Sequence, residues 1–142
     1  MSWTQPTELL RLMPFAMEIG VELVTASESA AVGRLAWAPQ RCTAGGLMHG
    51  GALMSLADTV GAVCAFLNLP LDATTATTSS VTQLFRGVRE GTVTATARPV
   101  HVGRSTIVVR TRLTDDGERL IAETTQTQAV LDSRSEAGVT RR

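Results

Sequence analysis

One segment constrains the fold more than any other: residues 50–67 repeat apolar side chains at the three- and four-residue spacing of an α-helix. The helix is expected to end at 68–70, because a proline disfavours the helical conformation of the residue before it. A second face of this helix carries small residues around one carboxylate, Asp58, and we infer that this face contacts another chain or a thin ligand. The apolar stripe consists of Leu53, Leu56, Val60, Val63 and Leu67, and the small face of Gly51, Met54, Ser55, Gly61, Ala62 and Ala65.

The rest of the chain changes to the period-two pattern of β-strands. Four segments rich in threonine and valine follow the helix, and short turn-like links at 89–91, 101–104 and 115–118 predict that consecutive strands are antiparallel neighbours. Two segments before the helix predict a hairpin, and the stretch after them a loop. The expected elements are a short helix at 7–13 ended by Pro14, strands at 21–27 and 31–38, a loop at 39–48, and strands at 74–85, 92–100, 105–113 and 120–131.

Together these elements predict an α+β domain in which an antiparallel sheet of about six strands wraps around one long central helix. A helix with two faces that avoid water needs a second cover, and a partner subunit is the natural one. The 142 residues fit a single domain, which we expect to span 1–131, with 132–142 as a frayed polar tail.

Charge and cysteine content argue against several classes of function. The 13 basic and 13 acidic residues balance, so no overall field favours nucleic acid. Cys42 and Cys64 lie far apart in a chain with two histidines, which argues against a zinc site and for reduced thiols. No basic and apolar leader opens the sequence, and polar residues interrupt the apolar run of 47–71. We therefore expect a cytoplasmic protein without a membrane span.

The start and middle of the long helix carry the functional signal. A carboxylate among apolar neighbours costs desolvation energy unless it is hydrogen-bonded or does chemistry, and this singles out Asp58. Gly50 and Gly51 leave backbone N–H groups accessible at the helix start, where negative charge is stabilised. One helix is therefore expected to supply both a general base or nucleophile and an anion hole. His49 is a second candidate base, because imidazole is a common general base in proteins.

The pattern Gly46-x-x-His49-Gly50-Gly51-x6-Asp58, followed by four antiparallel strands, resembles the hotdog-fold acyl-CoA thioesterases of the PaaI type. The order of elements matches over nearly the whole chain. The resemblance implies hydrolysis of an acyl-CoA without a metal or cofactor. It also implies a homodimer, often paired into a homotetramer, with active sites between the subunits.

The family pattern implies roles for individual residues. Asp58 takes the place of the catalytic carboxylate, and Gly50 that of the residue whose N–H binds the thioester oxygen. Thr77 takes the place of a hydroxyl residue on the next strand that positions the water or the carboxylate, with Thr78 as the alternative. Thr43 stands where the family has Asn, and its hydroxyl has a shorter reach than the amide.

Other residues are expected to bind the substrate. By resemblance, His49 orients the loop beside the thioester, next to Gly51. Arg86 and Arg104, at strand ends and turns, are expected to contact the phosphates of coenzyme A, with a solvated surface as the ordinary alternative. The acyl group is left open between aryl and medium-chain. The side chains that line a tunnel or fill the core include Trp37, Leu47, Met54, Phe66 and Phe85.

Two other functions stay open on the same fold. Enoyl-CoA hydratases carry Asp and His at a characteristic short spacing, whereas His49 and Asp58 are nine residues apart here. A protein that binds acyl-CoA without catalysis also fits the sequence, because Thr43 replaces the usual Asn.

Overall fold

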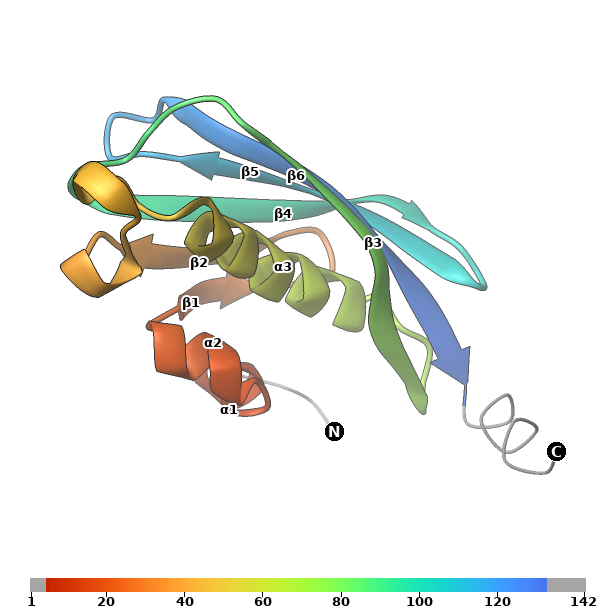
Figure 1. Cartoon of the computed structure of the whole chain (residues 1–142). Helices are drawn as coiled ribbons and strands as arrows, with labels where there is room; N and C mark the ends of the chain where they lie inside the picture. Colours follow the sequence, from red (N-terminus) through yellow and green to blue (C-terminus); the bar gives the residue numbers. More distant parts are fainter. Residues whose placement is uncertain (1–4, 133–142) are drawn as a thin grey trace, which may run out of the picture.

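The computed structural model describes residues 5–132 and shows one antiparallel sheet of six strands with a long helix against its concave face (Figure 1). The strand order is β1-β2-β4-β5-β6-β3, and every neighbouring pair is antiparallel. The strands are β1 (Glu22–Ala26), β2 (Ala31–Ala36), β3 (Ala73–Leu84), β4 (Thr92–Val102), β5 (Thr106–Thr114) and β6 (Leu120–Asp132).

The long helix, α3 (Gly50–Phe66), confirms the expected central helix and packs on the inner face of the sheet. Four members of its apolar stripe, Leu53, Leu56, Val60 and Val63, are buried against the sheet, whereas Leu67 follows the helix end and is half-buried. Burying side chains of this size contributes about 1.5–3 kcal/mol each to folding. The small face is divided: Gly61 and Ala65 are buried, whereas Met54 and Asp58 are exposed in the single chain.

The beginning of the chain differs from expectation. The first helix, α1 (Pro6–Arg11), is shorter than expected, and a second helix, α2 (Pro14–Ile19), follows it. Pro14 begins α2 instead of only ending α1, because a proline at the first helical position loses no hydrogen bond and has the required φ. The two helices cover the open side near β1 and α3.

The expectation that β3 and β4, which are consecutive in the sequence, are neighbours in the sheet is wrong. β3 pairs with β6 along almost its whole length and has no contact partner on its other edge among residues 5–132, whereas β4 lies between β2 and β5. The connection at 85–91 reaches about 23–25 Å when fully extended. That length is enough to cross the three strand spacings, about 14 Å, that separate β3 from β4.

Two smaller differences concern turns. The expected loop at 39–48 contains two short 3₁₀ helices, Pro39–Arg41 and Ala44–Gly46. The expected turn at 101–104 is tighter, because β4 continues through His101 and Val102. A bulge between Pro99 and His101 lets the strand continue past a residue that has no N–H to donate.

Among the described residues, no helix is long and apolar enough to cross a membrane. Within 5–132, no group of three or more His, Cys, Asp or Glu side chains is placed to hold a metal ion. β6 extends to Asp132, so the first residue of the expected tail belongs to the sheet. The rest of that expected tail, 133–142, lies outside the described residues.

Candidate active site

Asp58 lies on the exposed part of α3 and accepts two hydrogen bonds on one carboxylate oxygen. The Oγ1 of Thr77 donates to Asp58 Oδ1 over 3.0 Å, and the Nε2 of Gln126 donates to the same oxygen over 3.1 Å. Within the described part of the chain, no donor is recorded for Oδ2. The carboxylate is therefore held by one oxygen while the other is free to react.

The sheet selects Thr77 over Thr78 as the neighbour of Asp58. A bulge in β3 between Thr77 and Ser79 interrupts the pairing with β6 at this point. The hydroxyl of Thr78 donates to the backbone oxygen of Thr127 over 3.2 Å, away from the carboxylate. The first of the two alternatives thus contacts Asp58, whereas the second is bonded to the sheet backbone.

Gln126 was missed by the sequence analysis. It lies on β6 with 0% of its surface exposed, beneath α3, where the close approach requires Gly61: a Cβ there would stand 2.0 Å from Gln126 Oε1. A signal for it exists in the sequence. The inward-facing positions of β6 alternate with a period of two, and three of them carry polar side chains instead of apolar ones. These are Thr124, Gln126 and Gln128.

His49 caps the start of α3. Its Nδ1 accepts a hydrogen bond from the Gly51 N–H over 2.8 Å, which satisfies one of the donors that a helix start leaves open. No acceptor among residues 5–132 is recorded for the Gly50 N–H. Within these residues, the N–H group of Gly50 is therefore an unpaired donor at the positive end of a 17-residue helix.

Gly50 opens onto a cavity of about 240 Å³. The loop before α3 forms one wall of this cavity, and its hydrogen bonds fix it there: Thr43 N–H donates to the oxygen of Leu47 over 2.7 Å. The hydroxyl of Thr43 has no hydrogen bond recorded in the described chain. The cavity is lined by Thr43, Leu47, Met48, Gly50, Leu53, Leu84, Phe85, Arg86 and Gly87.

An apolar pocket of about 150 Å³ lies beyond the carboxylate along α3. Ala62 is one helical turn after Asp58, and Thr75 is two residues before Thr77 on the same face of β3, so the pocket and the carboxylate adjoin. α1 and the two residues that follow it form the remaining wall. The lining residues are Leu9, Leu12, Met13, Ala62, Val63, Phe66 and Thr75, which include one member of the expected tunnel, Phe66.

The two reactive features are too far apart to meet in one chain. Gly50 and Asp58 are separated by eight residues of one helix, which corresponds to about 12 Å along its axis. The expectation that one helix supplies both groups therefore holds for their presence on α3. Within one chain, however, the two groups are too far apart to act on the same carbonyl group.

The candidate arginines lie at opposite ends of the sheet. Arg86 follows β3 where β6 begins and lines the cavity beside Gly50. Arg104 lies in the β4–β5 turn, close to the last residues of β6, since Thr106 at the start of β5 pairs with Ala129. Both are exposed, but one chain does not bring them to the same ligand.

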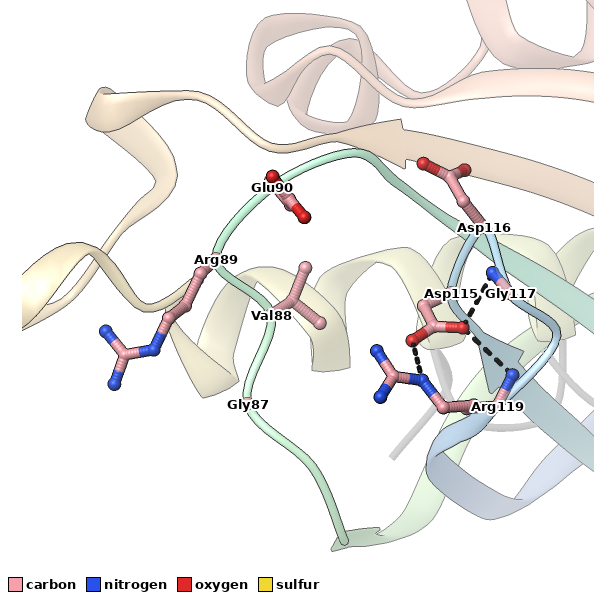
Figure 2. A pocket seen from close by; sticks show the side chains of 8 residues that line it. All are labelled: Gly87, Val88, Arg89, Glu90, Asp115, Asp116, Gly117 and Arg119. Atoms are coloured by element: carbon pink, nitrogen blue, oxygen red, sulfur yellow. Dashed lines mark hydrogen bonds and ion pairs between the residues drawn. The ribbon is translucent and has the colours of Figure 1, made fainter.

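A hollow of about 380 Å³ near the β5–β6 turn contains none of the candidate residues (Figure 2). Its charged groups stabilise local structure. The backbone N–H of Arg119 is the main cause that holds the pKa of Asp115 below its usual value, and the Arg119 side chain and Gly117 N–H act in the same direction. Arg89 points away and donates to the oxygen of Gly45 over 2.8 Å.

The two cysteines are not placed for nucleophilic chemistry. Burial raises the pKa of the Cys64 thiol to about 11, so this side chain stays a neutral part of the core. The Sγ of Cys42 donates to the oxygen of Ala38 over 3.3 Å, and no histidine is bonded to it in the described chain.

The six-stranded sheet around a central helix, with its carboxylate and its capped glycine start, defines a hotdog domain of the thioesterase class. The sequence profile described as "Thioesterase superfamily" matches residues 45–122, more than half of the chain, and the chain belongs to this superfamily.

Similar proteins support this assignment, and their matches cover different shares of the chain. A proposed esterase of Vibrio cholerae is 39% identical over 89 residues, which are 63% of this chain and 59% of that protein. A 1,4-dihydroxy-2-naphthoyl-CoA hydrolase of Listeria monocytogenes is 29% identical over 116 residues, 82% of this chain and 94% of that one. The structure of a phenylacetic acid degradation protein PaaI variant from Thermus thermophilus superposes with a TM-score of 0.77 at 25% identity, covering 83% and 99% of the two chains. The resemblance to PaaI-type hotdog proteins is thus confirmed.

Proposed function

We propose that this protein hydrolyses an acyl-CoA thioester to the free acid and coenzyme A, with Asp58 as the base or nucleophile. The observation that carries the proposal is the asymmetric carboxylate: Thr77 and Gln126 hold Oδ1, and Oδ2 is free at an accessible surface. A superfamily of thioesterases and an open helix-start donor at Gly50 support the same chemistry.

The reaction follows from the groups present. Oδ2 of Asp58 attacks the thioester carbonyl carbon, or removes a proton from a water that attacks it. The carbonyl oxygen becomes negative in the tetrahedral intermediate, and the Gly50 N–H at the positive end of a helix stabilises it. The C–S bond then breaks, and the thiolate of coenzyme A leaves and takes up a proton. In the covalent route, water finally hydrolyses the anhydride at Asp58.

The distance of about 12 Å between Gly50 and Asp58 along one helix favours a site shared by two protomers. In such a site, Asp58 of one protomer faces the Gly50 N–H of its partner. The edge of β3 and the exposed part of the small face of α3, around Met54 and Asp58, are the surfaces that would meet across a two-fold axis. We propose a homodimer, paired further into a homotetramer, as the active form.

The apolar pocket beside Asp58 supports an aryl group as the acyl part. A dry cavity of about 150 Å³ is large enough to hold benzene, and the pocket between α1 and α3 has this volume. The names of two similar proteins, a dihydroxynaphthoyl-CoA hydrolase and a phenylacetic acid degradation protein, also refer to aryl acids. We expect single-ring aryl-CoA substrates to react faster than long-chain acyl-CoA.

The coenzyme A part is expected to extend from the cavity at Gly50. Arg86 lines that cavity and is exposed, which suits a contact with a phosphate. Arg104 would contribute to the same molecule only if the partner subunit brought it there. A coenzyme A substrate and two free thiols are in keeping with a cytoplasmic location.

The residue at position 43 supports a second candidate function, binding of acyl-CoA without catalysis. The residue at the position of the usual Asn, Thr43, has a shorter polar side chain beside the cavity, which suits a protein that binds acyl-CoA without turning it over. Turnover measurements separate the two functions.

Replacing Asp58 by Asn tests the proposal directly. Turnover of a panel of aryl and medium-chain acyl-CoAs, followed by release of free thiol, should fall at least about a hundredfold, because general acid–base catalysis contributes that much. Asp72→Asn, at an exposed left-handed position that Asn tolerates, is the matched control and should keep its activity. Activity of Asp58→Asn within a few-fold of wild type would show that Asp58 is structural.

A further inference from the structure

Gln126 is a buried amide whose one recorded hydrogen bond goes to the carboxylate of Asp58. Its side chain is fully inaccessible, and Nε2 reaches Asp58 Oδ1 from below, from the inner face of β6. The superfamily profile ends at residue 122, before this position. The matched segment therefore does not include Gln126.

The burial of Gln126 is unfavourable in itself. Its Oε1 is buried without a hydrogen-bond partner, and an unsatisfied buried oxygen carries a desolvation penalty. The amide also requires a glycine in the middle of α3, because any side chain at Gly61 would collide with it. Both features weaken a core that a methionine or leucine would fill at lower cost, so they call for a reason other than stability.

We propose that Gln126 is a positioning residue, which fixes Oδ1 of Asp58 so that Oδ2 is presented to the substrate. This inference rests on the proposed function of Asp58. The exposed hydroxyl of Thr77 can turn and can either donate or accept, whereas the amide nitrogen is a donor only. Packing against Gly61 locks the amide, so the carboxylate keeps one orientation throughout the reaction.

The test replaces Gln126 by Met, which has a similar length and no hydrogen-bond donor. We expect kcat to fall about tenfold to a hundredfold, because this factor corresponds to the loss of one hydrogen bond to a charged group. KM should stay within about twofold, because Gln126 is buried beneath Asp58 and does not line the substrate cavities. The melting temperature should not fall, since the variant loses an unsatisfied oxygen.

Gln128→Met is the matched control. Gln128 is 1% exposed, lies two residues further along the same face of β6 and also has an unsatisfied Oε1, but no hydrogen bond joins it to Asp58 within 5–132. It should show the same change in melting temperature and a wild-type kcat. Equal losses of kcat in both variants would mean that the core, and not the contact with Asp58, is responsible, and would overturn the proposal.

The companion variant Asp58→Asn separates this inference from the proposed function. If Asp58→Asn is inactive while Gln126→Met keeps wild-type kcat, only the positioning role is wrong. If Asp58→Asn stays active, the proposed function itself is wrong. Should Gln126→Met fail to fold, Gly61→Ala gives the same readout, because its Cβ displaces the amide: a lower kcat at unchanged KM supports the proposal, and an unchanged kcat overturns it.

Discussion

At the scale of single residues, Thr43 is the position where a small change should increase activity. It lines the cavity at Gly50, and its hydroxyl has no hydrogen-bond partner recorded within residues 5–132. An amide there reaches further toward a bound thioester, and one such hydrogen bond contributes about 1–3 kcal/mol in a dry site. Thr43→Asn should therefore raise kcat roughly tenfold, since about 1.4 kcal/mol corresponds to that factor.

The measurement is thiol release with Thr43→Ser as the control, because serine keeps a short hydroxyl and should not gain activity. A lower kcat in Thr43→Asn would mean that the threonine hydroxyl already serves the reaction. The loop is held by backbone bonds, such as that from Thr43 N–H to Leu47, so the substitution should leave its course unchanged.

The residue scale also shows what sequence patterns can and cannot indicate. Asp58 and its contact with Thr77 could be predicted, because an isolated acid in an apolar helix and a family motif both mark them. Gln126 could not, because it comes 68 residues after Asp58 and meets it only through the pairing of β6 with β5 and β3. Such contacts between distant parts of the chain depend on strand order.

At the scale of elements, the start of α3 depends on the cap that His49 provides. Loss of an N-cap costs about 1 kcal/mol of unfolding free energy, and Asn is among the best capping residues. His49→Ala should therefore lower the free energy of unfolding by about that amount, whereas His49→Asn should restore most of it. Denaturant titration measures both.

Activity distinguishes the cap from the alternative that His49 is a catalytic base. If the imidazole only holds the helix start, His49→Asn should keep more activity than His49→Ala, in the same order as stability. If both variants lose activity equally while Asn restores stability, His49 takes part in the chemistry. The bond from Gly51 N–H to Nδ1 favours the first result.

The elements themselves were largely predictable, and their neighbours less so. Periodicity located α3 and all six strands, because apolar spacing reports directly which faces are buried. It could not place β3 beside β6, since the chain length at 85–91 allows either a tight turn or a crossing of the sheet end. α2 was not predicted, because a proline can both end one helix and begin the next, and the sequence pattern does not separate the two cases.

At the scale of the whole molecule, the exposed surfaces of one chain indicate a second copy. β3 is a long edge strand whose outer side is unpaired within 5–132, and natural edges of this kind are usually covered or charged. Apolar side chains surround it: Val81 and Phe85 are each 57% exposed, and Met54 on α3 is 44% exposed. A two-fold partner would cover this edge and join two halves of the proposed site.

A mixing experiment tests that shared site. Gly50→Pro removes the backbone donor at the first helical position, where proline is tolerated, and Gly50→Ala adds a Cβ but keeps the N–H. The Cβ would lie 3.1 Å from the tip of Leu84, so both variants fill the same space and differ in the donor. We expect Gly50→Pro to be nearly inactive and Gly50→Ala to keep much more activity, measured as kcat for thiol release.

Gly50→Pro and Asp58→Asn chains are then unfolded together and refolded as a mixture. If Asp58 of one protomer works with Gly50 of its partner, each mixed dimer has one intact site and one doubly altered site. Random pairing makes half of the dimers mixed, so activity should return to roughly a quarter of wild type. If each chain uses its own Gly50 and Asp58, no dimer contains an intact site and the mixture stays as inactive as its components. Sedimentation of the refolded sample confirms that dimers have formed, and an active monomer would exclude the shared site altogether.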